Sequence, residues 1–166
     1  MCIRDRCWSA RGDRDEALAL FAGWHPPVRA LIAGTESIFK WALFERPPLA
    51  TWTRGRVTLL GDAAHPMLPF LGQGAGQRIE DGLVLARCLA AHRADPERGL
   101  AAYAGGRQAR TAAVQRAARD RGRLVQQADQ AEIDARNARM RDDPDAQTAR
   151  NDWLWGYDAE RAPTES

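Results

Sequence analysis

The chain has 166 residues, of which 45% are hydrophobic and 28% are charged, and its formal net charge is +2. This length and apolar share suffice for one packed domain, and the small net charge provides no general attraction to nucleic acid. No apolar run approaches the length of a transmembrane helix, and the N-terminus lacks the hydrophobic core of a signal peptide. The three cysteines, Cys2, Cys7 and Cys88, form no CxxC pair. This argues against a disulfide framework or a zinc site and favours a cytoplasmic protein without a bound metal.

The first part of the chain predicts helix after an unassigned start. Residues 1–12 fit no predicted element, and we expect an artefactual N-terminus there. Residues 13–33 predict a helix, with Asp13 as its cap and Glu16 completing a box-like capping pattern. The helix is expected to break at His25, which two prolines follow, and His25 is expected to be a loop residue and not a ligand.

Residues 37–45 predict a strand, because aromatic and apolar side chains are concentrated between Gly34 and Pro47. The aromatic rings of Phe39, Trp41 and Phe44 are more simply explained as sheet core than as a binding surface.

A second strand is predicted at Val57-Thr58-Leu59-Leu60, where aliphatic and β-branched residues follow one another with no polar alternation beyond Thr58. Such a run is typical of a strand buried on both faces. The strand ends at Gly61, and Asp62 follows at once. Ligands of open α/β sheets bind beyond the carboxyl ends of the strands, so Asp62 stands where a ligand is expected.

The glycine-rich stretch of residues 72–76 precedes a predicted helix that extends to about His92. A helix start carries unpaired N–H groups and a partial positive charge, and glycines let a ligand approach the backbone closely. The stretch is not a P-loop, because Gln77 and Arg78 stand where that loop needs lysine and a hydroxyl residue. It is not the dinucleotide fingerprint either, because Gln77 occupies the position of its last glycine. By pattern alone, an anionic-ligand site and an ordinary glycine-rich turn are equally good interpretations. The apolar face of this helix is predicted from helical spacing at Ile79, Leu83, Ala86 and Ala90.

His65 invites a catalytic interpretation that the sequence does not support. Asp62 and His65 have no serine or cysteine placed to complete a triad, and as a metal pair they lack further ligands. We expect His65 to shape the loop through hydrogen bonds.

The remaining chain predicts helices. Asp95 and Pro96 mark a helix start. Residues 108–140 form a long polar helical pattern that Gly122 can bend or interrupt, and residues 142–144 end it. Its thin alanine-rich row suits a weak coiled coil or, preferably, packing along a larger body. A short closing segment contains three aromatic residues expected to pack against the body, and residues 159–166 are expected to be a disordered tail. The alanine-rich row is Ala117, Leu124, Ala131 and Ala138, and the aromatic residues of the closing segment are Trp153, Trp155 and Tyr157.

The central stretch resembles the second FAD motif of class A FAD-dependent aromatic monooxygenases, the family of salicylate and 3-hydroxybenzoate hydroxylases. The matching residues are Gly61-Asp62-Ala63-Ala64-His65-Pro66, Pro69, Gly72-Gln73-Gly74 and Glu80-Asp81. A looser likeness extends from about Leu20 to Asp158. The chain departs from the family pattern at Gly76, where asparagine is usual, and at Arg78, where a small residue is usual.

The resemblance implies a fold class and a division of the chain. It implies an α/β protein, the C-terminal fragment of a GR2-type FAD-binding fold, mostly helical with one or two buried strands. Residues 13–50 would end the substrate domain, and residues 51–158 would form the C-terminal part of the FAD-binding domain with its long helices. The family's first FAD motif, GxGxxG, is absent from this chain, so an N-terminal part of the same enzyme is an expected partner.

The resemblance also implies a chemistry. Such an enzyme uses FAD, NADH or NADPH, and O₂ to insert one oxygen atom into a small aromatic, phenolic substrate. No nucleic acid or membrane is expected as a partner, and a homodimer is one possible assembly. Asp62 is expected to bond the ribityl chain, residues 72–76 to face the flavin pyrimidine oxygen, and Pro69 to line the reactive face. No residue is identified as a catalytic acid or base, and the fragment alone is expected to be inactive. The expected FAD-binding residues are Gly61, Asp62, Ala63, Pro69, Gly72, Gln73, Gly74, Ala75 and Gly76. The alternative is a non-catalytic helical interaction module built on residues 108–140.

Overall fold

The computed structural model describes residues 10–165, without the side chains of residues 147 and 148. The chain divides into two compact units, one reaching Leu43 and one starting at Phe44. Most of the unassigned segment 1–12, with Cys2 and Cys7, lies outside the described residues.

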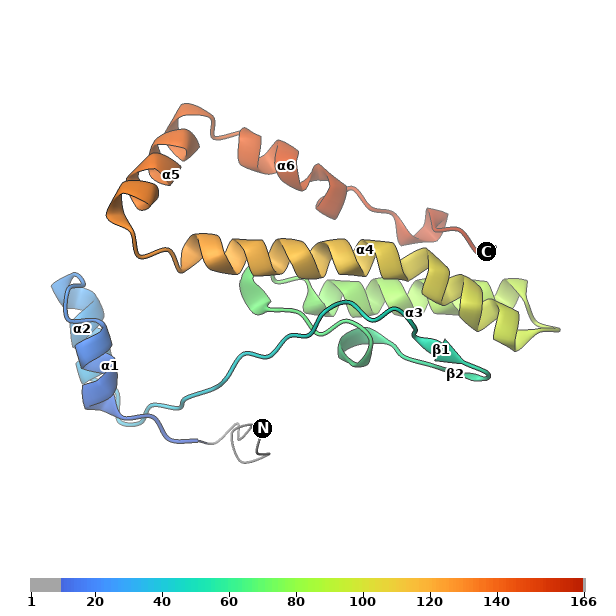
Figure 1. Cartoon of the computed structure of the whole chain (residues 1–166), viewed down its shortest axis with the longest axis horizontal. Coiled ribbons are helices and arrows are strands. Elements are labelled where there is room, and N and C mark those ends of the chain that lie inside the picture. The colour runs from blue at the N-terminus through green and yellow to red at the C-terminus, as the bar shows by residue number, and fades with distance from the viewer. Residues whose placement is uncertain (1–9, 166) are drawn as a thin grey trace. The chain divides into compact units, whose positions relative to one another are not determined.

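The N-terminal unit contains two neighbouring helices, α1 (Arg14–Leu20) and α2 (Pro26–Ala33), as Figure 1 shows. Asp13 caps α1, because its Oδ1 accepts hydrogen bonds from the backbone N–H groups of Asp15 at 2.7 Å and Glu16 at 2.9 Å. The predicted cap and the predicted interruption before the two prolines are therefore confirmed. Glu16 does not complete a capping box; its carboxylate binds Lys40 at 2.8 Å.

The strand predicted at residues 37–45 is wrong. The segment forms a single antiparallel bridge, Arg11 to Phe39, flanked by two backbone hydrogen bonds that join residues 10–12 to residues 38–40. The aromatic side chains are 48%, 58% and 42% exposed at Phe39, Trp41 and Phe44. A strand needs a partner along its length, and residues 10–12 provide one only for a single pair.

The C-terminal unit begins with a two-stranded antiparallel hairpin, β1 (Thr53–Arg54) and β2 (Val57–Thr58). Gly55 turns the chain with a φ of 56°, a value that favours glycine. The predicted doubly buried strand at residues 57–60 is therefore wrong: β2 has two residues, and Val57 is 68% exposed. Only β1 pairs with it among residues 10–165, and burial of both faces requires layers above and below a wider sheet.

Helices α3 (Gly74–Ala91) and α4 (Pro96–Val125) lie side by side and form the body of this unit (Figure 1). Both helices were predicted to start where they do, and Asp95 caps α4 by accepting from the Arg98 N–H at 3.1 Å. The predicted apolar face of α3 is wrong, however. Ile79 is 75% exposed, and the buried row of α3 is Gln77, Asp81, Val84 and Cys88.

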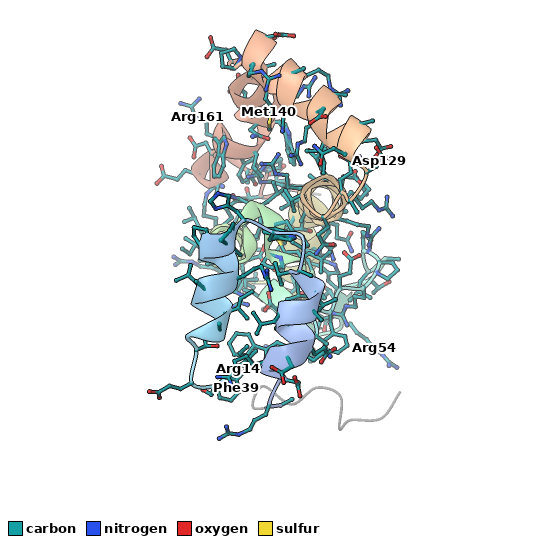
Figure 2. All side chains as sticks on the ribbon, turned by 90° about the vertical axis from the view of Figure 1, so that its left-hand side faces the viewer. Arg14, Phe39, Arg54, Asp129, Met140 and Arg161 are labelled. Carbon is teal, nitrogen blue, oxygen red and sulfur yellow. The ribbon has the colours of Figure 1, made fainter. Side chains whose placement is uncertain are left out.

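The long polar pattern of residues 108–140 is not one helix. Helix α4 continues through Gly105 and Gly106 to Val125, and α5 (Gln130–Asp142) starts after a break of four residues. Gly122 is not the break, because it lies inside α4, where a Cβ would stand 2.5 Å from the Phe70 ring. Helix α5, between the labelled Asp129 and Met140 in Figure 2, has no fully buried residue.

The C-terminal end differs from its sequence-based prediction in both α6 and the tail. In α6 (Ala146–Trp155), Leu154 is buried, while Trp153 and Trp155 are 44% and 64% exposed, so two of the three expected packing aromatics remain outside. The prediction of a disordered tail is wrong for the described residues. Arg87 of α3 donates to the carbonyls of Ala159 and Ala162 at 3.0 and 2.8 Å, which fixes the tail on the helix. The described part of the chain is thus mostly helical with one small sheet, and none of its helices is long and apolar enough to span a membrane.

Candidate cofactor site

The predicted FAD-binding residues gather around the start of α3. Residues Gly61–Ala63 form the short 3-10 helix η2, which packs on α3. Pro69 begins a second one, η3 (Pro69–Leu71), which packs on α4. The backbone then turns at Gly72, with a φ of 64°, into the first residues of α3. Residues separated by the whole loop are therefore brought to one region of the C-terminal unit.

In the described part of the chain, no side chain caps the backbone N–H groups at the start of α3. Gln73 occupies the cap position without a side-chain hydrogen bond, and the first turn contains no acidic residue. A Cβ added at Gly72 or Gly74 would meet no atom within 4 Å. This open and electropositive backbone can receive a polar or anionic group, which fits an oxygen of the flavin ring.

Asp62 lies on η2 with its side chain 57% exposed, so its carboxylate is accessible to a ligand. Its Oδ2 accepts a hydrogen bond from the guanidinium of Arg78, which reaches it from α3. Arg78, which stands where the family usually has a small residue, is therefore paired with the predicted cofactor residue. Asp62 can accept from a hydroxyl through its other oxygen, which fits a ribityl chain.

A buried carboxylate holds this turn in place. Oδ2 of Asp81 accepts from the Gly61 N–H at 3.0 Å and from His65 Nε2 at 2.6 Å, while Oδ1 accepts from Arg107 Nε at 2.8 Å. Burial raises the pKa of Asp81, but the hydrogen bonds from His65, Arg107 and the Gly61 backbone outweigh it and leave the pKa lowered. One ionised side chain of α3 thus joins the Asp62 turn to α4.

Glu80, Arg107 and Arg110 complete the cluster around Asp81. Arg107 also donates to Glu80 at 2.7 Å and to Gln77 Oε1 at 2.8 Å. Arg110 donates to both oxygens of Glu80 at 2.8 and 2.9 Å, and its guanidinium lies 3.8 Å from the centre of the Tyr157 ring. Burial raises the pKa of Glu80, but the hydrogen bonds and charges of Arg110 and Arg107 outweigh burial and leave that pKa lowered. The carboxylates of Glu80 and Asp81 are therefore both ionised. Two negative and two positive charges balance, which offsets the cost of burying them.

His65 is a buried member of this cluster. It is 1% exposed, and because the Asp81 carboxylate accepts, its Nε2 carries the hydrogen that is donated. The ring lies 5.4 Å from that of Trp52, and its Nδ1 has no hydrogen-bond partner in the described part of the chain. The structure therefore agrees with the loop-shaping role expected from the sequence.

Two residues that were not predicted support the loop after β2: Gln115 of α4 and Arg46 of the connector before β1. Gln115 is 1% exposed and donates to the carbonyls of Pro66 at 2.9 Å and Arg46 at 3.3 Å. The Arg46 side chain in turn donates to the carbonyl of Ala63. The sequence offered no signal for Gln115, because a glutamine in a polar helix is most simply read as solvated.

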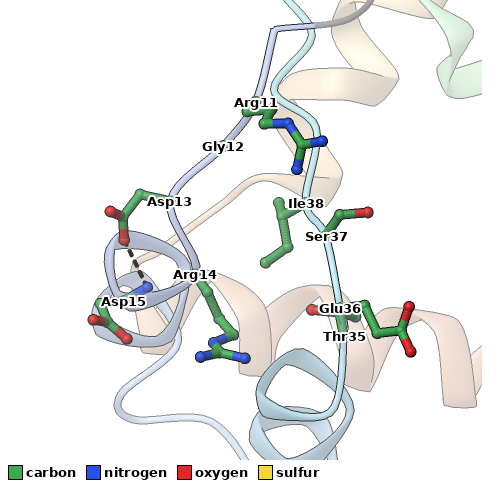
Figure 3. A pocket seen from close by; sticks show the side chains of 9 residues that line it. All are labelled: Arg11, Gly12, Asp13, Arg14, Asp15, Thr35, Glu36, Ser37 and Ile38. Carbon is green, nitrogen blue, oxygen red and sulfur yellow. Dashed lines mark hydrogen bonds between the residues drawn. The ribbon is translucent and has the colours of Figure 1, made fainter.

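A separate pocket lies within the N-terminal unit, between residues 11–15 and residues 35–38 (Figure 3). Backbone hydrogen bonds from Glu16 and Asp15 lower the pKa of Asp13 on its wall. Helix capping accounts for that shift, and none of the predicted site residues lines the pocket. It is therefore not the candidate cofactor site.

Comparison with known proteins identifies the relatives of this chain. A family model described as an FAD binding domain matches residues 37–118. The chain is 43% identical to a 3-amino-4-hydroxybenzoate 2-monooxygenase from Streptomyces platensis, over 96% of this chain and 39% of that relative. It is 41% identical to a 6-hydroxynicotinate 3-monooxygenase from Pseudomonas fluorescens, over 90% of this chain and 34% of that relative. A solved salicylate hydroxylase substrate complex matches with a TM-score of 0.78 and 33% identity, over 96% of this chain and 39% of that one.

The chain thus spans between 34% and 39% of the length of these relatives. Sequence identity runs through nearly all of the chain, and the residues that the domain model matches include every predicted FAD-binding residue. The resemblance seen in the central motif is confirmed, and the chain belongs to the family of FAD-dependent aromatic monooxygenases related to salicylate and 3-hydroxybenzoate hydroxylases.

Proposed function

We propose that this chain is the C-terminal portion of an FAD-dependent monooxygenase that uses NADH or NADPH and O₂ to hydroxylate a small aromatic substrate. The observation that carries the proposal is an accessible carboxylate, Asp62, on a turn held by Asp81 and joined through Arg78 to α3, whose start is uncapped. The relatives are named for hydroxybenzoate and hydroxynicotinate substrates. A phenolic or similarly hydroxylated aromatic acid is therefore the proposed substrate class.

The residues of the site divide the binding of FAD among them. Asp62 accepts hydrogen bonds from the ribityl hydroxyls, and Gly61 and Ala63 bring the backbone of η2 close to the same chain. The N–H groups of residues 72–76 face the pyrimidine edge of the flavin, where the partial positive charge of α3 stabilises negative charge. Pro69 lines the side of the ring on which the substrate binds. FAD, when bound, supplies the redox chemistry of the reaction.

Asp81 gives this site its rigidity. Its carboxylate accepts from the Gly61 N–H, so a buried contact holds the residue next to Asp62. Placement matters because an error of about 1 Å in a reacting group can cost on the order of a hundredfold in rate. Residues 13–50 are proposed to belong to the substrate domain and residues 51–158 to the FAD-binding domain.

The alternative, a helical interaction module on residues 108–140, has less support. The inner face of α4 is already occupied, since Thr111, Val114 and Gln115 are buried against the unit. The pattern is also interrupted after Val125, so it presents no continuous surface.

The test is FAD binding by the natural gene product that carries these residues. In Asp62→Ala the dissociation constant for FAD should rise roughly ten- to hundredfold, because a hydrogen bond to a charged group is lost. Asp120→Ala, which removes another exposed carboxylate, should bind as the wild type does. Flavin fluorescence titration measures both, and NAD(P)H oxidation with hydroxybenzoates then probes turnover. If the wild-type protein bound no FAD, the proposed function would be refuted.

A further inference from the structure

Arg78 is built into the turn that carries Asp62. Gly61 has a φ of 60°, and a Cβ added to it would stand 2.8 Å from Cγ and 3.2 Å from Cδ of Arg78. The absence of a side chain at Gly61 therefore leaves the space in which the aliphatic part of Arg78 lies. This contact directs the guanidinium to Asp62 and distinguishes Arg78 from an arginine extended into solvent.

The guanidinium is only partly used by its contact with Asp62. In the described part of the chain its hydrogen bond to Oδ2 of Asp62 engages one terminal nitrogen, and the two side chains are 50% and 57% exposed. Exposed ion pairs contribute little to stability, so fold stability alone gives no strong reason for the arrangement. The guanidinium fork has five N–H donors and matches the geometry of phosphate oxygens.

The covalent structure of FAD connects these observations. Asp62 is proposed to accept from the ribityl chain, and the far end of that chain is esterified to the diphosphate. A cation held against Asp62 is therefore close to the one segment of the ligand where hydroxyl groups give way to phosphate. The two side chains together offer an acceptor for the hydroxyls and a donor for the anion.

We propose that Arg78 binds a phosphate group of the flavin cofactor directly, beside the ribityl contact of Asp62. This rests on the proposed function. Arg78 is then a binding residue in its own right and does not act only by orienting Asp62. Part of the affinity for FAD must accordingly be electrostatic and sensitive to salt.

The experiment measures the dissociation constant of FAD by fluorescence titration in the natural gene product. Arg78→Ala should raise it about tenfold, and Arg78→Lys should raise it less because the charge is kept and the fork is lost. The exposed Arg93, in the turn after α3, provides the matched control: Arg93→Ala should change nothing. The ratio of the FAD dissociation constant of Arg78→Ala to that of the wild type should shrink when the salt concentration is raised, because the lost contact is between charges.

A second background separates direct binding from orientation of Asp62. In Asp62→Ala, the further change Arg78→Ala should still weaken binding about as much as it does alone. Loss of the effect in that background, or unchanged or tighter binding in the single variant, would overturn the proposal. Failure of the wild-type protein to bind FAD would instead remove the proposed function itself, so the two failures are distinct.

Discussion

Replacement of Asp81 by asparagine tests the buried cluster that supports the candidate site. The carboxylate accepts from three donors, at 3.0 Å from Gly61, 2.6 Å from His65 and 2.8 Å from Arg107. An asparagine of the same shape has one oxygen and one NH₂ group. In either orientation its NH₂ faces at least one donor, and the charge of Arg107 loses a partner.

The size of the effect follows from burial. Asp81 and Arg107 are both 0% exposed, so the groups left without an acceptor cannot recover a bond to water. Each unsatisfied buried donor costs about 1–3 kcal/mol, and breaking a buried ion pair costs about 3–5 kcal/mol. Because Arg107 keeps its contact with Glu80, we expect the free energy of unfolding to fall by about 3–5 kcal/mol in total.

The assay is urea denaturation of the natural gene product, followed by tryptophan fluorescence. Asp120→Asn is the control, since Asp120 is 71% exposed and pairs with Arg123 at 3.5 Å on the surface; its effect should stay within about 0.5 kcal/mol. At 10 °C below the midpoint of its own thermal unfolding, Asp81→Asn should also bind FAD more weakly, because the Gly61 N–H has lost its carboxylate acceptor. Equal unfolding curves for Asp81→Asn and wild type would refute the assigned role of the carboxylate.

The same residue predicts a pH dependence. The folded chain holds the pKa of Asp81 below its ordinary value of 3.8, so the unfolded chain takes up the proton first as the pH falls. Its contribution is therefore complete at neutral pH and is lost as the pH falls below about 4 and through the lowered folded pKa. Denaturation curves from pH 7 to pH 3 should show the gap between wild type and Asp81→Asn narrowing only in the acid range. A gap of constant size would contradict an ionised Asp81.

Three further predictions concern glycines and the chain as a unit. In thermal unfolding, Gly122→Ala should lower the free energy of unfolding by about 1–3 kcal/mol, because its Cβ would stand 2.5 Å from Phe70. Gly105→Ala adds its Cβ to open space and should raise the free energy of unfolding by roughly 0.5–1 kcal/mol. Gly74→Val should reduce hydroxylation per bound flavin more than Gly55→Val, since Gly74 lies at the proposed ring contact; a weaker Gly55 enzyme would misplace the site. The 166-residue chain alone should elute from gel filtration without stoichiometric FAD and oxidise no NAD(P)H, because Val57 at 68% and Ile79 at 75% exposure leave apolar surface uncovered; a monomer with bound FAD would contradict this.

Local signals in the sequence were sufficient to place the starts of α1 and α4. Asp13, Asp95 and Pro96 mark starts that the structure shows, because a cap or a proline acts on the adjoining turn and needs no distant partner. The motif from Gly61 to Asp81 likewise identified the family, since it combines residue types at fixed spacing. The specific roles of its members in FAD binding remain predictions.

Other features depended on contacts between distant parts of the chain. The expected strands at residues 37–45 and 57–60 shrank to a bridge and a hairpin, because strand length depends on partners. The tail at residues 159–166 was predicted to be disordered, yet carbonyls on its described part accept from Arg87, 72 and 75 positions earlier in the chain.

The buried face of α3 shows most clearly where sequence and tertiary structure divide. By itself the sequence determined that residues 74–91 form a helix, because helical spacing and a glycine-marked start are local properties. It favoured Ile79 for the interior, on the rule that apolar residues are buried. Only the tertiary structure decided that Gln77 and Asp81 face inward, because Arg107, 26 positions after Asp81, reaches both side chains. A polar side chain can be buried when its partners are present, and those partners are supplied by the fold.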